Sequence, residues 1–516
     1  MIASIPSAVL LGVDGLPVSV EVHVSNGLPG LTIVGLPDAA VRESRDRVRA
    51  AFASSGLPWP RRRITVNLAP SGMRKAGAGL DLPVAVGVLV ASGCLDPAAV
   101  AGLAFVGELG LDGSVRGVPG ALVLADALAG HRLVVAGSSL DEARLAGGSC
   151  VSAPTLAEVV ARCTGRRPWT DPPPSLSGRS PSSGSDPEPG PTGSAAEDLA
   201  DVLGQPVARR ALEAAAAGGH HLLLVGPPGA GKTLLANRLA GLLPDLDLAT
   251  ARDVTRVHSA AGQLMSGGGL VTRPPFRAPH HGVSAVALVG GGSTAMRPGE
   301  IGLAHGGVLF LDELGEFPAA VLDALRQPLE DGTVRVSRSR GSITYPAQFL
   351  LVAAMNPCPC GDAGVPGGCR CSPASRARYA RRLSGPLLDR FDIAVRVERA
   401  DATSLLGSGA GEATAPVAAR VATARQRAAD RGVSTNSRLP SRSLDELAPV
   451  DDGAGALLER HLRARGLSAR GLHRVRRLAR TLADLDGADD TLTVPHVTEA
   501  LFLRGGRSLL LGEVVR

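Results

Sequence analysis

Residues 226–233 read Gly226-Pro227-Pro228-Gly229-Ala230-Gly231-Lys232-Thr233 and match the pattern G-x-x-x-x-G-K-[ST] in full. An apolar run at 222–225 precedes them, and a helical pattern follows at 234–239. In this strand–loop–helix context, backbone N–H groups turn onto phosphate oxygens and the helix N-terminus favours an anion. We expect Lys232 to reach the outer phosphates of ATP and the Thr233 hydroxyl to hold Mg²⁺. A chance glycine turn is the alternative, but motif and flanks agree on a nucleotide site.

The composition limits how this chain can contact other molecules. Only two of its 54 basic residues are lysines, Lys75 and Lys232, so the loop keeps a compact ammonium where arginine is used elsewhere. The net charge of +6 permits contact with nucleic acid, and the 2% aromatic content argues against base stacking as the main mode of binding. Any DNA contact is expected to run through arginine and backbone amides to phosphate.

No targeting or membrane-spanning segment is expected. Residues 1–20 lack a basic start, Asp14 interrupts their apolar stretch, and longer apolar runs such as 82–91 are too short for a bilayer. Seven cysteines in a long chain without a signal peptide argue for a reducing compartment and against a disulfide framework. We therefore predict a cytoplasmic protein without membrane contact.

A composition break divides the chain. Nineteen of the 28 residues at 168–195 are Pro, Gly or Ser, a composition that predicts a flexible linker. Strand-like and helical patterns alternate on both sides of it, and helical patterns alone follow from about residue 415. We predict an α/β protein with four segments: an N-terminal α/β domain, a linker, a P-loop core with a parallel sheet, and a C-terminal helical domain, at 1–165, 166–196, 197–397 and 398–516.

Two further apolar runs of the core end in polar residues. The run 308–311 leads to Asp312 and Glu313, where one carboxylate can help to place Mg²⁺ and the next can polarise the attacking water. The run 349–354 leads to Asn356, whose amide could orient that water. Downstream, Arg390 and Arg470 could stabilise charge on a transferring phosphoryl group, although a solvated surface charge is the default interpretation of any one arginine.

The cysteines fall into two groups. Cys358, Cys360, Cys369 and Cys371 form C-x-C-x₈-C-x-C and could supply four thiolates to Zn²⁺, with free thiols as the alternative. Cys94, Cys150 and Cys163 are isolated and are expected in the core.

These motifs, in this order, are similar to those of AAA+ ATPases. Four more segments narrow the match: RPPFRAPHH at 273–281, VGGGS at 289–293, RPGEI at 297–301 and NPCPCG at 356–361. Together they closely resemble the magnesium-chelatase-like YifB/ComM family over nearly the whole chain. The segment KAGAGLDLP at 75–83 and Gly107-Glu108-Leu109 resemble the Lon-protease fold, but Gly79 stands at the position of the Lon nucleophile. We therefore expect a non-proteolytic N-terminal domain that could bind DNA or a partner.

The resemblance implies residue roles. Lys232 and Thr233 act on phosphate and Mg²⁺, Asp312 and Glu313 form Walker B, Asn356 is sensor 1 and Arg470 is sensor 2. Arg390 is the arginine finger that reaches a neighbouring subunit's nucleotide, which implies a ring, expected as a homohexamer. An insert is expected at 264–306 and a hairpin at 332–346, whose tip carries Arg338 and Arg340 as DNA contacts in the ring pore. A solvated basic turn is the alternative there.

The resemblance implies an ATP-driven ring motor acting on single-stranded or branched DNA. The ComM branch consists of branch-migration helicases that help to integrate incoming strands in natural transformation. Two alternatives stay open: a magnesium-chelatase-type motor subunit that remodels a protein partner, and a nucleotide-dependent switch without translocation. The intact Glu313 and Arg390 argue against the switch.

Overall fold

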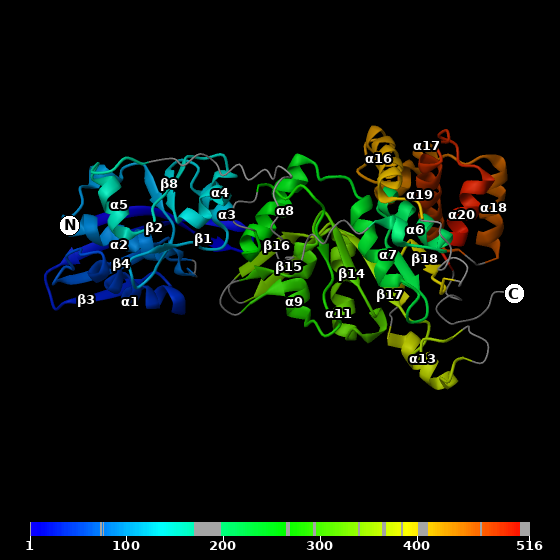
Figure 1. The fold of residues 1–516 in the computed structure, drawn as a ribbon, viewed down its shortest axis with the longest axis horizontal. Coiled ribbons are helices and arrows are strands. Elements are labelled where there is room, and N and C mark those ends of the chain that lie inside the picture. The colour runs from blue at the N-terminus through cyan, green and yellow to red at the C-terminus, as the bar shows by residue number, and fades with distance from the viewer. Residues whose placement is uncertain are drawn as a thin grey trace.

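The structure, a computed structural model, describes residues 2–72, 75, 77–169, 198–264, 269–292, 296–338, 341–363, 368–382, 385–400, 411–464 and 467–505. Its parts follow one another along the long axis: the N-terminal region at one end, a parallel sheet in the middle and helices at the other end (Figure 1). The expected linker at 166–196 lies outside the described residues from position 170 onward. Among the described residues, no helix is both long and apolar enough to cross a membrane.

The N-terminal region contains a four-stranded sheet, a three-stranded sheet and the short antiparallel pair β6–β7, with helices between and beside them. Alternate residues of β2 and β4 are buried, valines in β2 and Ile64, Val66 and Leu68 in β4, which is why these segments form half-buried strands. The four-stranded sheet has the order β1-β2-β4-β3, and the three-stranded parallel sheet has the order β5-β8-β9. The elements are β1 (Ile2–Leu11), β2 (Asp14–Ser25), β3 (Gly30–Val34), α1 (Ala39–Ser54), β4 (Arg63–Ala69), α2 (Asp81–Ala91), β5 (Leu103–Phe105), β6 (Glu108–Leu109), β7 (Val115–Arg116), α3 (Ala121–Ala127), β8 (Arg132–Val135), α4 (Leu140–Arg144), β9 (Cys150–Ser152) and α5 (Leu156–Cys163).

The isolated cysteines and the expected lack of a Ser-Lys pair can be compared with the structure of this region. Cys150 and Cys163 are buried as expected, but Cys94 is exposed, because it follows the end of α2 in a surface turn. Lys75 is fully buried, and its ammonium donates to the carbonyl oxygen of Pro70. Gly79 offers no hydroxyl, so it cannot form a Ser-Lys pair with Lys75, as the sequence predicts.

The middle of the molecule is built on a five-stranded sheet in the order β11-β14-β17-β10-β18, in which every pair is parallel. All residues of β10, β14 and β17 are buried, as expected for strands covered on both faces. The elements are α6 (Pro206–Gly218), β10 (Leu222–Val225), α7 (Lys232–Leu239), α8 (Leu248–Ala261), β11 (Phe276–Arg277), α9 (Ala285–Val289), β12 (Gly290–Gly291), β13 (Arg297–Pro298), α10 (Glu300–Leu303), β14 (Val308–Leu311), α11 (Ala319–Ala324), α12 (Arg326–Asp331), β15 (Thr333–Arg338), β16 (Gly341–Pro346), β17 (Leu350–Met355), α13 (Pro373–Arg382), α14 (Gly385–Leu388) and β18 (Ile393–Arg396).

The two faces of this sheet pack against different partners. Leu222 and Leu224 share a core with α6, α7 and the C-terminal helices. Leu223 and Val225 point to the other face, where the core includes α8, α10, the β15–β16 hairpin and Val13 from the N-terminal region. The sheet therefore joins all parts of the molecule.

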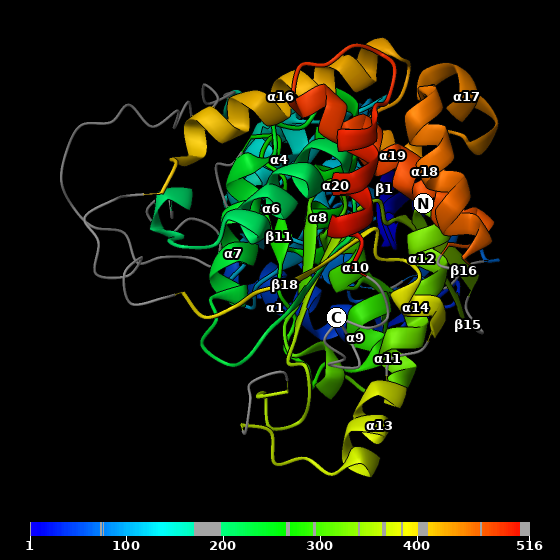
Figure 2. The same ribbon diagram turned by 90° about the vertical axis from the view of Figure 1, so that its right-hand side faces the viewer.

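The C-terminal region is helical, as the sequence predicts. Figure 2 shows its helices gathered on one side of the molecule, while α13 lies on the opposite side. The long α19 buries one face, including Val475, Leu478 and Leu482, against α6, α16 and α20. The elements are α16 (Thr414–Asp430), α17 (Leu444–Leu447), α18 (Asp452–Arg463), α19 (Ala469–Leu485) and α20 (Val494–Leu503).

Candidate nucleotide-binding site

The glycine-rich loop connects β10 to the N-terminus of α7. Gly226 begins the loop at a point of close backbone contact, because a Cβ there would lie 2.2 Å from the carbonyl oxygen of Val397. The Lys232 ammonium at the other end of the loop donates to the carbonyl oxygens of Gly226 and Pro227 at 2.8 and 2.9 Å. The loop thus curls around its own lysine.

Lys232 is a cation in a confined place. Its residue surface is only 9% exposed, and burial lowers the pKa of the ammonium, while the charges of Asp312 and Glu313 act to raise it. A buried ammonium surrounded by oxygen atoms gains from a further anionic partner. Phosphate oxygens of a nucleotide fit this requirement.

Thr233 and the carboxylates after β14 form the second part of the site. The Thr233 hydroxyl donates to Asp312 Oδ2 at 2.7 Å, and the other carboxylate oxygen accepts from the Glu313 backbone N–H at 2.8 Å. A hydroxyl beside a carboxylate is an oxygen donor set suited to Mg²⁺, which prefers few protein ligands plus water and phosphate. These two side chains are the ones that would hold the ion.

Asn356 joins the network from the next strand. It follows β17, which lies between β14 and β10, and its Oδ1 accepts from the Lys232 ammonium at 3.1 Å. The structure therefore brings together Lys232, Thr233, Asp312, Glu313 and Asn356, all named from the sequence.

One residue of this site, His281, was not predicted from its residue type or spacing. Its Nδ1 lies 3.1 Å from Glu313 Oε2, and its ring stacks against His280 with centroids 4.0 Å apart. Glu313 itself has a left-handed backbone, with φ 53°, which directs its chain after the strand. His281 reaches Glu313 because β11 pairs with β14. The only signal in the sequence was its place in the 273–281 motif.

Arg390 lies at the opposite end of the sheet. Nearby, the Asp392 backbone N–H donates to the carbonyl oxygen of His221, which precedes β10, whereas the glycine-rich loop follows that strand. The Arg390 guanidinium pairs with Glu330. It lines a cavity of about 660 Å³ between the sheet and the C-terminal helices. Arg390 therefore faces away from the nucleotide loop of its own chain.

Arg470 is exposed near the start of α19, one turn before Arg474. Arg474 Nε lies 3.6 Å from Asp392 Oδ1 and lines the same cavity as Arg390. The structure thus places Arg470 near the same end of the sheet as Arg390, where β10 begins.

The predicted hairpin at 332–346 is present as β15 and β16, paired from Thr333↔Pro346 to Arg338↔Gly341. Val334, Val336 and Ile343 are buried on one face, and Arg335 is exposed on the other. The side chain of Arg338 and all of Arg340 lie outside the described residues.

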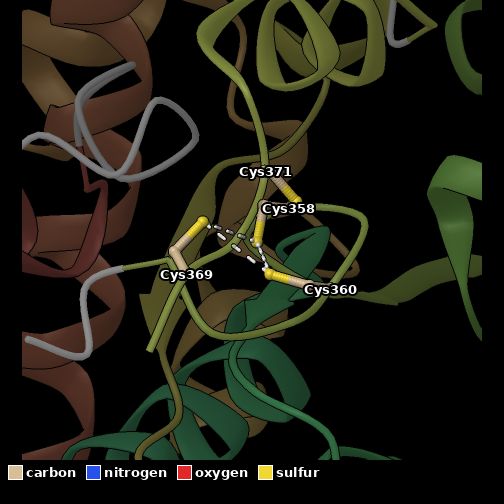
Figure 3. Close-up of side chains that lie close together, drawn as sticks. All are labelled: Cys358, Cys360, Cys369 and Cys371. Carbon is tan, nitrogen blue, oxygen red and sulfur yellow. Dashed lines mark hydrogen bonds between the residues drawn. The ribbon is translucent and has the colours of Figure 1, made fainter. Parts of the chain in front are cut away.

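The four cysteines of the C-x-C-x₈-C-x-C motif converge (Figure 3), with every Sγ within 4.8 Å of the others. Cys358 Sγ lies 3.3 Å from Cys360 Sγ and 3.8 Å from Cys369 Sγ. Zn–S bonds of about 2.3 Å in a tetrahedron put sulfur atoms roughly 3.8 Å apart, so the cluster fits one such ion.

The electrostatics of the cluster also suit a cation. The backbone N–H of Asp362 and a hydrogen bond from Cys358 lower the pKa of Cys360 to about 6, whereas burial raises the pKa of Cys358 to about 12. A bound cation would favour ionisation of the thiols, because metal ligation requires the thiolate form.

Comparisons with known proteins agree over nearly the whole chain. Three family descriptions match: "Magnesium chelatase, subunit ChlI" at residues 198–405, "Subunit ChlI of Mg-chelatase" at 20–136, and "Magnesium chelatase, subunit ChlI C-terminal" at 411–504. YifB of Escherichia coli is 43% identical over 509 residues, 97% of this chain and 96% of that protein. Competence protein ComM of Haemophilus influenzae is 42% identical over 521 residues, 99% of this chain and 98% of that protein.

The chain belongs to the magnesium-chelatase-like YifB/ComM family. Lon protease 2 of Bacillus subtilis is also similar, at 31% identity over 150 residues, 26% of this chain and 25% of that protein. The fold class predicted from the sequence is confirmed: a Lon-protease-like N-terminal α/β region, an AAA+ P-loop core and a C-terminal helical region. The domain boundaries stay predictions.

The geometry predicts how a change at Glu313 separates binding from turnover. Glu313→Gln keeps Lys232, Thr233 and Asp312, so ATP affinity is expected to stay near the wild-type value. Hydrolysis is expected to fall by about 10²- to 10⁴-fold, because the amide cannot accept a proton from water. Nucleotide titration and steady-state phosphate release measure the two quantities. Glu459→Gln, at an exposed position of α18, is the matched control. Near-normal hydrolysis by Glu313→Gln would show that another group activates the water.

Proposed function

We propose that this family member is an ATP-hydrolysing ring motor that acts on DNA in the cytoplasm. The observation that carries the proposal is the network at one edge of the sheet, in which Lys232 contacts Asn356 and Thr233 contacts Asp312. The family supports an ATPase. Motor action, DNA and the ring are our proposal.

Each residue of the site has a task in hydrolysis. Lys232 binds the outer phosphates and offsets their charge as the γ-phosphoryl group departs. Thr233 and Asp312 hold Mg²⁺, which supplies electrostatic stabilisation of the phosphate oxygens. Glu313 takes the proton of the attacking water and Asn356 orients that water. His281 fixes the Glu313 carboxylate through the contact at 3.1 Å.

The position of Arg390 supports the ring. An arginine that stabilises the transferring phosphoryl must reach it, and Arg390 lies at the sheet edge remote from its own glycine-rich loop. A head-to-tail contact between copies of the chain brings one subunit's Arg390 to the next subunit's nucleotide, and such contacts close into rings. We propose a homohexamer, with Arg470 as a second arginine at the nucleotide.

Mixing two inactive variants tests this arrangement. Arg390→Ala keeps a complete nucleotide loop, and Lys232→Ala keeps the trans arginine, so each alone is expected to be nearly inactive. In a random equimolar mixture, about a quarter of head-to-tail contacts join an intact loop to an intact arginine, and ATPase activity should reappear in proportion. Native mass spectrometry checks that mixed assemblies form. Mixed assemblies without recovered activity would contradict an arginine acting in trans.

DNA is the proposed substrate, single-stranded or branched, as in ComM-like branch migration during recombination or natural transformation. One relative is named competence protein ComM. The buried face of the β15–β16 hairpin packs on the core, and its other face exposes Arg335. We propose that Arg338 and Arg340, which the sequence predicts at the tip of this hairpin, contact DNA phosphates.

The variant Arg338→Ala plus Arg340→Ala tests the substrate. It should weaken binding to forked DNA, reduce the slope of log affinity against log salt by about one to two, and stop strand movement. Basal ATPase should remain, because Lys232 and Glu313 are unchanged. Arg442→Ala plus Arg463→Ala removes the same charge from exposed positions of the helical region and is the control.

A magnesium-chelatase-type motor that remodels a protein partner is the second candidate, favoured by the chelatase family matches along the chain. If the Arg338→Ala plus Arg340→Ala variant loses basal hydrolysis while DNA affinity is unchanged, this candidate replaces the DNA motor.

We further propose that the four-cysteine cluster holds one structural Zn²⁺ per subunit. Elemental analysis of protein purified without chelator is expected to give about one zinc per chain. Cys358→Ser plus Cys371→Ser should lose it, and Cys94→Ser, at an exposed cysteine outside the cluster, should keep it. Iron in place of zinc, or unchanged metal in the double variant, would contradict the assignment.

A further inference from the structure

The four-cysteine cluster is a direct neighbour of the nucleotide loop. Asn356 precedes Cys358 by two residues in the sequence, and its amide oxygen accepts from the Lys232 ammonium at 3.1 Å. A change in the backbone at Cys358 therefore moves Asn356, two residues away, and alters its hydrogen bond with Lys232.

A second contact is made by packing. Gly361 follows Cys360 and has a left-handed backbone, with φ 87°. A Cβ at this position would lie 2.3 Å from Pro228 Cδ and 2.8 Å from Pro228 Cγ. The cysteine loop thus rests on Pro228, in the middle of the glycine-rich loop, with no room for a side chain between them.

A third contact is ionic. Arg399 lies after β18, downstream of the cysteine loop in the sequence. Its NH2 group lies 3.8 Å from Asp362 Oδ1, and its Nε donates to the carbonyl oxygen of Pro228 at 3.4 Å. Arg399 therefore links the cysteine loop to the same proline that Gly361 touches.

We propose that metal occupancy of the four-cysteine cluster sets the conformation of the nucleotide loop and thereby the affinity for ATP. This inference rests on the proposed zinc site and ATPase. Cys358, Cys360 and Cys369 belong to two chain segments, and a shared ion holds these segments together. Without the ion, the segment from Asn356 to Asp362 loses that tie, and all three contacts to the nucleotide loop change with it.

Linkage gives the inference a quantitative form. If bound metal raises ATP affinity by some factor, bound ATP must raise metal affinity by the same factor, and couplings of this kind usually lie between about 5- and 150-fold. The two affinities can be measured independently of turnover. A Glu313→Gln background allows both to be read with intact ATP.

The first experiment compares zinc-loaded, chelator-stripped and zinc-reloaded protein in that background. Stripping should weaken ATP binding by about tenfold, reloading should restore it, and saturating ATP should slow zinc loss to a colorimetric chelator and lower the zinc dissociation constant by about the same tenfold. Circular dichroism verifies that the stripped protein remains folded. Folded, stripped protein that binds ATP within about twofold of the loaded form would overturn the inference.

The second experiment alters the contact without touching a cysteine. Gly361→Ala forces Pro228 to move and should weaken ATP binding while the zinc content is unchanged. Gly432→Ala is its matched control, because Gly432 also has positive φ, 80°, but has open space around its Cβ position. Equal ATP affinity in the two variants would overturn the inference.

The outcomes separate the inference from the proposed function. If wild-type protein hydrolyses ATP and its ATP affinity does not depend on zinc, the proposed coupling is wrong and the proposed motor stands. If the protein binds ATP in a zinc-dependent way but never hydrolyses it, the proposed motor is wrong and the proposed coupling stands. Protein that binds no nucleotide contradicts both.

Discussion

Parallel pairing of β14, β17 and β10 is the constraint on which the site depends. Adjacent parallel strands end at the same edge, so whatever follows each strand meets there. Asp312, Asn356 and the glycine-rich loop follow these three strands in turn. The buried ammonium of Lys232 then ties two of the strand ends together through Asn356 and the loop carbonyls. The sheet's hydrophobic burial thereby fixes polar groups that are far apart in sequence.

The same rule decides what the sequence could predict. Strand ends could be found because each buried run stops at a polar residue, and parallel order places those residues together. His281 could not be found in this way, since β11 has only two residues and no clear pattern of its own. The contact of Gly361 with Pro228 was equally hidden, because it depends on the path of a loop. The cysteine spacing predicted convergence, whereas Cys94 was wrongly expected in the core.

The sheet also separates two kinds of positive charge. Lys232 lies at the edge where the strands end, and Arg390 and Arg474 lie at the edge where β10 begins. The C-terminal helices pack on α6 and reach the second edge, so Arg470 lies there too. Lys232 and the two arginines are therefore held at opposite ends of one sheet. The proposed contact between neighbouring subunits depends on this separation.

The N-terminal region contacts the core beside the β15–β16 hairpin. Val13, between β1 and β2, is 8% exposed and shares a core with Val334, Val336 and Ile343. Arg256 of α8 lies 3.6 Å from Asp14 and 3.7 Å from Asp126, which adds ion pairs around this contact. Because packed cores shift between discrete arrangements and do not deform freely, a displacement of the hairpin must repack Val13 or carry it along. The N-terminal region, which has no nucleophile at Gly79, thus packs against the hairpin and supports its position.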